Sequence, residues 1–175
     1  MIVPDAKDWT WVLERRCDDC GFDATAFAVT ETGARTRANA AAWEVLLQRD
    51  DATVRFRPDR WSVLEYACHV RDVYRVYDGR LARMLDEDGP HYDNWDQDET
   101  AAAEGYHAQD PAQVSPALVE AAETVAARFD TVTGDQWSRT GYRSDGAVFT
   151  VESFARYFIH DPVHHLYDVT GRRAV

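Results

Sequence analysis

The chain has 175 residues, of which 45% are hydrophobic and 12% aromatic, so we expect one globular domain, residues 1–175, with a substantial core. A formal net charge of −12 disfavours nucleic acid and anionic membranes as partners, because both are negatively charged. No apolar run approaches the roughly 20 residues that span a bilayer. The N-terminus lacks the pattern of a signal peptide, and we therefore expect a cytoplasmic protein.

Residues 1–22 have no regular periodicity and are expected to form an N-terminal arm that packs on the body. The arm contains Cys17 and Cys20, a C-x-x-C pair of a kind that binds zinc or acts in redox chemistry. A structural zinc would need two more ligands, and the sequence has no second such pair. Neighbouring Asp18 and Asp19 should raise the pKa of both thiols. We therefore favour two reduced thiols without a defined role, with a disulfide as the alternative.

A first helix is predicted to start at Asp23 or Thr25 and to end near Gln48. Its expected inward positions lie near the helical period and are Phe27, Ala38, Ala42, Val45 and Leu46. After a connection over residues 49–60, a second helix is predicted from Val63 to about Leu85. Ser62 and Glu65 have the spacing of a capping box at its start.

Residues 86–110 form a long acidic connection, and connections of this length are usually functional or cross the end of a bundle. A third helix is predicted from Asp110-Pro111 to about Val132. Residues 138–149 suggest a short hairpin or an irregular loop, and Thr150 can cap a last helix that ends near Thr170. These elements predict an all-α four-helix bundle with a short hairpin before the last helix.

Three histidines on the predicted helices suggest a metal site. His160 and His164 are four residues apart and share a helix face, and His69 lies on the second helix. Three such ligands leave a coordination position open for water or substrate. His165 should point about 100° away from His164 and is not expected to be a ligand. Pro162 predicts a kink that could re-aim His160.

Carboxylates near these histidines could orient the imidazole rings by accepting their second N–H, and these are Asp72, Asp161 and Asp168. In the long connection, Trp95 and Asp96 are either part of an acidic surface loop or the lining of a substrate pocket. Tyr157 and Arg156 on the last helix are further candidates for that pocket, with surface ion pairing as the alternative role of the arginine.

Residues 61–72 read W-S-V-L-E-Y-A-C-H-V-R-D and resemble the W-S-x-x-E-x-x-x-H-[VL]-x-D signature of the DinB-like (DinB/YfiT) superfamily. The late His160-x-x-x-His164 is similar to the closing H-x-x-x-H helix of that family. The resemblance covers residues 25–170 and implies a four-helix bundle with up-down-down-up connectivity. It also implies a divalent metal, zinc or nickel, held by His69, His160 and His164.

Several members of that superfamily are thiol-dependent transferases or isomerases, similar to mycothiol-dependent maleylpyruvate isomerase. The resemblance thus implies a metalloenzyme with a small-molecule substrate, and a low-molecular-weight thiol such as mycothiol as cofactor. The expected reaction is metal-assisted thiol transfer, or a related hydrolytic or isomerising step at the same site. Two other hypotheses stay open: a non-catalytic bundle stabilised by metal, and a small-ligand-binding module without metal. Bundles of this kind often associate, so a homodimer is compatible with the sequence.

Overall fold

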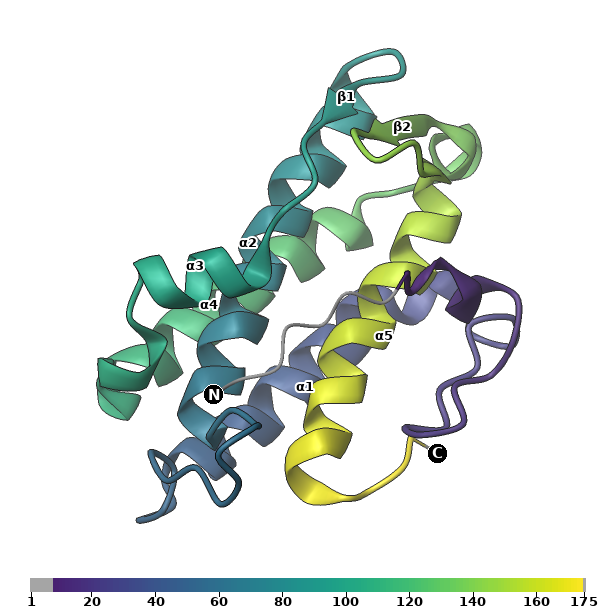
Figure 1. The fold of residues 1–175 in the computed structure, drawn as a ribbon. Coiled ribbons are helices and arrows are strands. Elements are labelled where there is room, and N and C mark those ends of the chain that lie inside the picture. The colour runs from purple at the N-terminus through teal and green to yellow at the C-terminus, as the bar shows by residue number, and fades with distance from the viewer. Residues whose placement is uncertain (1–7, 175) are drawn as a thin grey trace.

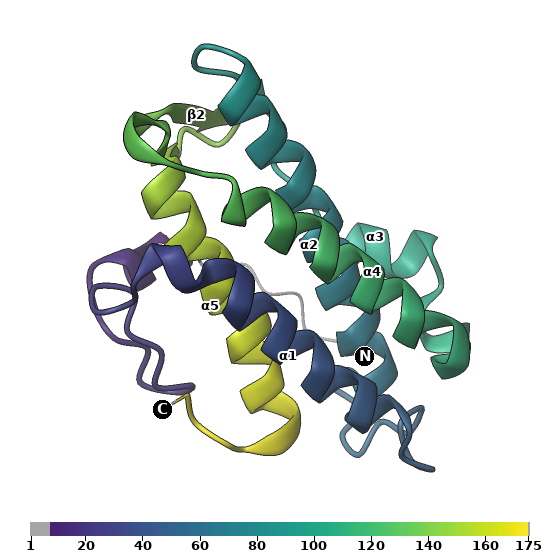
Figure 2. The same ribbon diagram turned by 180° about the vertical axis from the view of Figure 1, so that it is seen from behind.

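The structure is a computed structural model that describes residues 8–174. Four long helices form its body, and their bounds are α1 Thr32–Leu47, α2 Val63–Asp86, α4 Pro111–Asp130 and α5 Val151–Thr170. Figures 1 and 2 show these helices packed around a shared interior, with the sheet at one end of α2 and α5. None of the described helices is long and apolar enough to cross a membrane.

Residues outside the long helices form short elements. A three-stranded sheet has the order β1 (His91–Tyr92), β2 (Thr140–Arg143) and β3 (Val148–Thr150). Strands β2 and β3 are antiparallel, as expected of a hairpin, and β1 joins β2 in parallel. The fold is therefore mostly helical with a small sheet, rather than purely helical. The long connection also contains the short helix α3, Gln97–Ala103.

Local signals in the sequence define the start of each long helix except the first. Ser62 and Glu65 form the predicted capping box of α2, and Thr150 caps α5 by accepting a hydrogen bond from the Ser153 N–H. Asp110 caps α4 with Pro111 at its first position. Helix α5 continues through Pro162, so the proline does not end the helix.

The predicted start of the first helix was wrong by several residues. Asp23 accepts hydrogen bonds from both the backbone N–H and the hydroxyl of Thr25, and this local turn competes with helix formation. Helix α1 begins only at Thr32. Its predicted inward face was also wrong, because Val45 is 68% exposed whereas Trp43 is fully buried. The helix is rich in alanine, so its hydrophobic pattern is too weak to identify the buried face.

A polar residue lies at the centre of the bundle. The Asn39 side chain accepts hydrogen bonds from Trp43 Nε1 (2.9 Å) and the Tyr74 hydroxyl (2.8 Å), and donates one to the Pro162 carbonyl (2.8 Å). Asn39 therefore links α1, α2 and α5, and satisfies buried polar groups on all three. The apolar core around it includes Leu64, Leu118 and Phe158.

Candidate metal centre

His69 on α2 is fully buried, and neither of its ring nitrogens has a hydrogen-bond partner among the described residues. Its ring lies parallel to that of Trp95 with centroids 5.4 Å apart, and the ring of Trp61 is also 5.4 Å away. Burial lowers the pKa of His69, so the imidazole is neutral near pH 7 and has a lone pair available for a ligand. A buried imidazole without partners is costly unless another group binds it.

Asp161 and His165 on α5 complete a group with His69. Asp161 Oδ1 lies 3.4 Å from His69 Nε2 and 3.7 Å from His165 Nε2. The rings of His69 and His165 meet edge to face with centroids 4.7 Å apart. Asp161 Oδ1 is buried and, like His69 Nε2, lacks a partner with hydrogen-bond geometry among the described residues. The three donor atoms all lie within 4.8 Å of one another.

These residues fit a divalent cation. Metal–ligand bonds of about 2.1 Å in tetrahedral geometry place neighbouring ligand atoms about 3.4 Å apart, close to the two distances to Asp161 Oδ1. Burial opposes ionisation of Asp161, but positive charge on the neighbouring His69 and His165, when these imidazoles are protonated, holds the pKa of this carboxyl well below its usual range. A buried carboxylate beside imidazoles lacks a full counter-charge, which a cation would supply.

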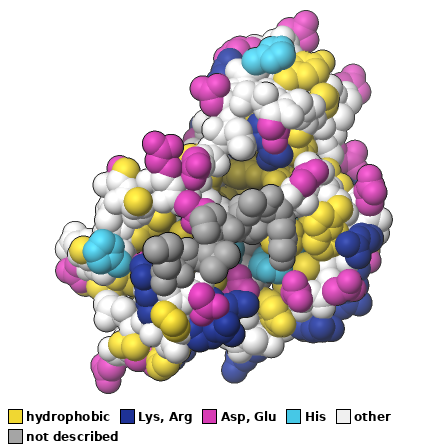
Figure 3. Space-filling model, viewed as in Figure 1, with side chains coloured by type: hydrophobic (Ala, Val, Ile, Leu, Met, Phe, Trp, Pro, Cys, Tyr) yellow, Lys and Arg dark blue, Asp and Glu magenta, His cyan; other side chains and the backbone are white. Residues whose placement is uncertain are grey.

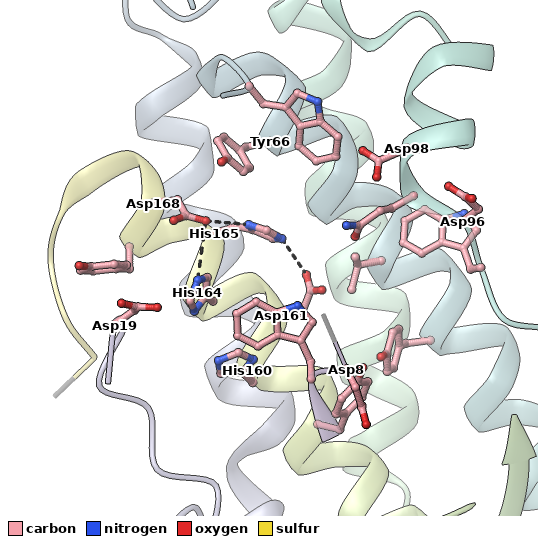
Figure 4. Close-up of a pocket in the computed structure, with 18 of the residues that line it drawn as sticks. Asp8, Asp19, Tyr66, Asp96, Asp98, His160, Asp161, His164, His165 and Asp168 are labelled. Atoms are coloured by element: carbon pink, nitrogen blue, oxygen red, sulfur yellow. Dashed lines mark hydrogen bonds and ion pairs between the residues drawn. The ribbon is translucent and has the colours of Figure 1, made fainter. Parts of the chain in front are cut away.

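Asp168 positions His165. Its Oδ2 lies 3.1 Å from His165 Nδ1 on the side of the ring opposite Asp161 (Figure 4). Arg60 in turn donates to Asp168 at 3.3 Å. A carboxylate on one ring nitrogen fixes the tautomer, and the other nitrogen of His165, Nε2, is the one that faces Asp161. Asp168 was expected to orient one of the three predicted ligands, whereas its hydrogen bond is to His165, which was not among them.

Asp72 does not take the orienting role expected from the sequence. Its carboxylate accepts hydrogen bonds from Arg71 (2.9 Å), Arg75 (3.0 Å) and the Tyr106 hydroxyl (2.6 Å). The Tyr106 hydroxyl belongs to η3 (Tyr106–Ala108), so the carboxylate links α2 to η3, and no hydrogen bond to His69 is found among the described residues. Asp161, predicted to orient a histidine, instead offers its own oxygen to the group.

A cavity of about 1150 Å³ opens next to the group. Asp161 and His165 line it, together with Trp61, Tyr66, Trp95 and Tyr157. Figure 4 shows Asp161, His165 and Asp168 on α5, with Asp96 and Asp98 at the start of α3 across the view from them. Of the residues predicted for a pocket, Trp95, Asp96 and Tyr157 line this cavity. Arg156 lies outside the lining, because its guanidinium bonds the Ala24 carbonyl and Glu152.

The structure divides the predicted three-histidine set between two groups. His69 joins Asp161 and His165, whereas His160 and His164 join Cys17 and Cys20. The reason is helical phase, because Asp161 and His165 share one face of α5 while His160 and His164 share the next, about 100° away. Asp161-x-x-x-His165 has the same i, i+4 spacing as the histidine pair, so the sequence contained this signal beside the other. His165, not expected to be a ligand, is therefore part of the first group.

Charge on the surface agrees with the composition. Figure 3 shows Asp and Glu side chains scattered over the displayed face and interspersed with basic ones, rather than gathered in one region. Around the cavity, however, eight aspartates and three arginines line the walls. The cavity is therefore more acidic than basic.

The family model described as the DinB superfamily matches residues 33–169. The chain belongs to the DinB superfamily. Among solved structures, a similar one is that of YfiT from Bacillus subtilis, described as a probable metal-dependent hydrolase with an unusual four-helix bundle topology. The two structures superpose with a TM-score of 0.74 at 19% sequence identity, and the match covers 82% of this chain and 84% of the YfiT chain. No curated protein matches.

Within this DinB-superfamily chain, the matched segment contains His69, Asp161 and His165. It also contains His160 and His164, but Cys17 and Cys20 lie before its start at residue 33. The cysteine pair thus belongs to the part of the chain that the family match does not cover.

Proposed function

We propose that this protein is a metal-dependent enzyme that hydrolyses a small molecule, with its cation held by His69, Asp161 and His165. The observation that carries the proposal is the pair of buried atoms without hydrogen-bond partners, His69 Nε2 and Asp161 Oδ1, beside a large cavity. Asp161 Oδ1 lies 3.4 Å from His69 Nε2 and 3.7 Å from His165 Nε2, and one cation can bridge atoms at these distances. YfiT, which has the same fold, is described as a probable metal-dependent hydrolase, and this supports hydrolysis as the reaction.

When bound, the cation would act as a Lewis acid toward a substrate oxygen or a nucleophile in the cavity. The protein's own groups prepare the site. Asp168 holds His165 in one tautomer, and Trp61 and Trp95 pack against the ring of His69 and shield it from water. With three protein ligands, positions toward the cavity stay open for substrate.

Charge in the cavity favours a neutral or cationic substrate. Eight aspartates line it against three arginines, and a divalent cation would offset only part of this excess. The arginines are also already engaged. Arg143 pairs with Asp145 at 2.8 Å, Arg80 donates to the Asp93 carbonyl, and Arg60 binds Asp168. Recognition of a substrate carboxylate by these arginines is therefore disfavoured.

Thiol transfer is a second candidate for the reaction. The cavity volume of about 1150 Å³ exceeds the range of about 300–1,000 Å³ for ligand pockets, and leaves room for a thiol co-substrate such as mycothiol beside an acceptor. A cation in the first group would favour the thiolate form of a bound thiol. Zinc or nickel suits a donor set with two imidazoles.

We also propose the up-down-down-up connectivity for the bundle. The segment between α2 and α4 contains β1, α3 and η3, and is long enough to return along the bundle before α4 begins. The connections from α1 to α2 and from α4 to α5 are shorter.

Metal content and activity test the proposal together. Wild type and the variants His69→Gln, Asp161→Asn and His165→Gln would be purified from metal-supplemented cultures and measured by mass spectrometry for bound metal. Each variant should contain one equivalent of metal less than the wild type. Activity would be measured on a panel of neutral and cationic esters and amides, and toward the best of these substrates each variant should be at least about 100-fold less active. Assays with and without added thiol separate hydrolysis from thiol transfer.

The variant His107→Gln is the matched control, because His107 is exposed and is not among the residues that line the cavity. It should keep both metal and activity. Full metal content and activity in Asp161→Asn and His165→Gln would refute the proposed site.

A further inference from the structure

Four buried side chains meet outside the group described above. Cys17 and Cys20 come from the N-terminal arm, and His160 and His164 from one face of α5. Their exposed fractions are 1%, 0%, 4% and 9%. One donor atom of each lies within 4.8 Å of those of the other three. Two thiols in a C-x-x-C pair and two imidazoles four residues apart are the ligand types and spacings of Cys₂His₂ zinc sites.

The distances suit a single ion. Bonds of about 2.3 Å to sulfur and about 2.0 Å to nitrogen place tetrahedral S and N ligands about 3.5 Å apart. Cys17 Sγ lies 3.5 Å from His164 Nδ1. Independently, His160 Nε2 is buried and has no hydrogen-bond partner among the described residues. An unsatisfied nitrogen at this place is explained by a ligand that the four side chains share.

A fixed turn presents the two thiols. The Gly21 N–H donates to the Cys17 carbonyl at 2.9 Å, and the Cys17 N–H donates to the Phe22 carbonyl at 2.8 Å. Gly21 has φ of +79°, which favours glycine at this position. The Ala174 N–H donates to the Cys20 carbonyl at 2.7 Å, and Figure 1 shows the arm and the C-terminal segment side by side. The turn is thus held from within and from the C-terminal segment.

A carboxylate lies behind His164 as well. Asp168 Oδ2 is 4.0 Å from His164 Nε2, while His164 Nδ1 faces Cys17 (Figure 4 shows the Asp168 side). At 4.0 Å this is an electrostatic contact rather than a hydrogen bond, and it places the carboxylate near the ring nitrogen that does not face Cys17. Asp168 therefore stands between the two groups, because it also binds His165.

We propose that Cys17, Cys20, His160 and His164 form a second metal site, a closed tetrahedral zinc site with a structural role. Both thiols give up their protons to solvent when the ion binds. Four protein ligands leave no position for substrate, which distinguishes this site from the first. The site joins the arm to α5 across about 140 residues of chain. Because the four ligands meet only in the folded protein, the free energy of zinc binding adds to the free energy of unfolding.

The site also positions part of the cavity wall. Trp9 packs against both imidazoles, with ring centroids 5.3 Å from His160 and 5.0 Å from His164. Trp9, Asp8 and Asp19 line the cavity. Zinc binding would thus fix the arm residues that face the substrate. The proposal itself does not depend on the reaction proposed above.

Cobalt substitution tests this site directly, because a thiolate bound to Co²⁺ gives a sulfur-to-metal charge-transfer absorption that histidine and carboxylate ligands do not. Protein stripped of metal under reducing conditions would be titrated with Co²⁺. The wild type should show the thiolate absorption. The double variant Cys17→Ser/Cys20→Ser should lose it, lose one zinc equivalent in metal analysis, and unfold at a lower temperature than the wild type in the presence of zinc.

Two variants serve as controls. Cys68→Ser removes the third buried cysteine, whose Sγ lies 3.4 Å from Gln109 Oε1, and should keep the absorption. Asp161→Asn should also keep it, because it changes only the first site. If Co²⁺ binds without the thiolate absorption, if the Cys17→Ser/Cys20→Ser variant keeps all its zinc, or if the two thiols prove to be a disulfide, the second site is refuted. If the variants of His69, Asp161 and His165 lose metal but Cys17→Ser/Cys20→Ser does not, the second site is refuted and the first stands. The opposite result refutes the first site and leaves the second.

Discussion

Glu65 has two structural roles at the start of α2. Its carboxylate accepts hydrogen bonds from the backbone N–H and hydroxyl of Ser62, both at 2.9 Å, and pairs with Arg55. The side chain is only 3% exposed. Burial would raise the pKa of Glu65, but the bonds from Arg55 and Ser62 outweigh it and hold the pKa below its ordinary value of 4.5. The ionised form therefore stabilises the fold.

We predict that Glu65→Gln lowers the free energy of unfolding by about 2 kcal/mol at pH 7, because charge-assisted hydrogen bonds are lost. The folded-state pKa is depressed, so this contribution is present above pH 4.5 and is lost as pH falls through the folded pKa. Urea denaturation between pH 7 and pH 3 should show the two proteins converging in stability at the acid end. A constant difference across that range would contradict the prediction.

Two helical glycines lie in opposite environments. A Cβ on Gly33 in α1 would meet the Asp130 carboxylate carbon at 2.9 Å and the Ala126 carbonyl at 3.0 Å, both on α4. Gly79 in α2 has nothing within 4 Å of the same position. Close approach of α1 and α4 thus depends on the absence of a side chain at residue 33, whereas residue 79 has no such requirement.

We predict opposite signs for the same substitution at these two positions. Gly79→Ala should stabilise the protein by about 0.5–1 kcal/mol through helix propensity. Gly33→Ala should destabilise it by about 1–3 kcal/mol, since the methyl group must displace Asp130 and the α4 backbone. Thermal unfolding followed by circular dichroism measures both. A stabilised Gly33→Ala protein would show that α1 and α4 can separate without cost.

Across the whole molecule, buried histidines link stability to pH. Burial lowers the pKa of His69 and His164, and lowers that of His160 to about 4. In the unfolded chain these groups titrate near 6.5. Unfolding therefore takes up protons between these values, and the stability present above pH 6.5 is lost as pH falls toward 4.

We predict that metal-free protein, kept in excess chelator, loses stability between pH 7 and pH 4, with His160 contributing up to about 3 kcal/mol. Chemical denaturation at a series of pH values measures the effect. His160→Asn removes one titrating group and should make the dependence shallower over that window. An equal slope in wild type and variant would mean that His160 does not control acid sensitivity.

Much of the fold followed from local signals. The starts of α2, α4 and α5 were predicted from capping residues, because a cap is a contact between residues two or three positions apart. The start of α1 and its buried face were predicted wrongly, because Asp23 and Thr25 form a local turn and an alanine-rich helix shows little hydrophobic periodicity.

The sequence by itself determined which chemical groups are present and how they are spaced: one histidine on α2, a run of histidines and aspartates on α5, and a cysteine pair before the helices. Only the tertiary structure decided which of them meet. Successive residues on α5 point about 100° apart, so the rotation of that helix about its own axis determines whether His160 or Asp161 faces α2. Packing against the arm and α2 sets that rotation, and residues 17 and 160 are too distant in sequence for any local pattern to reveal their contact.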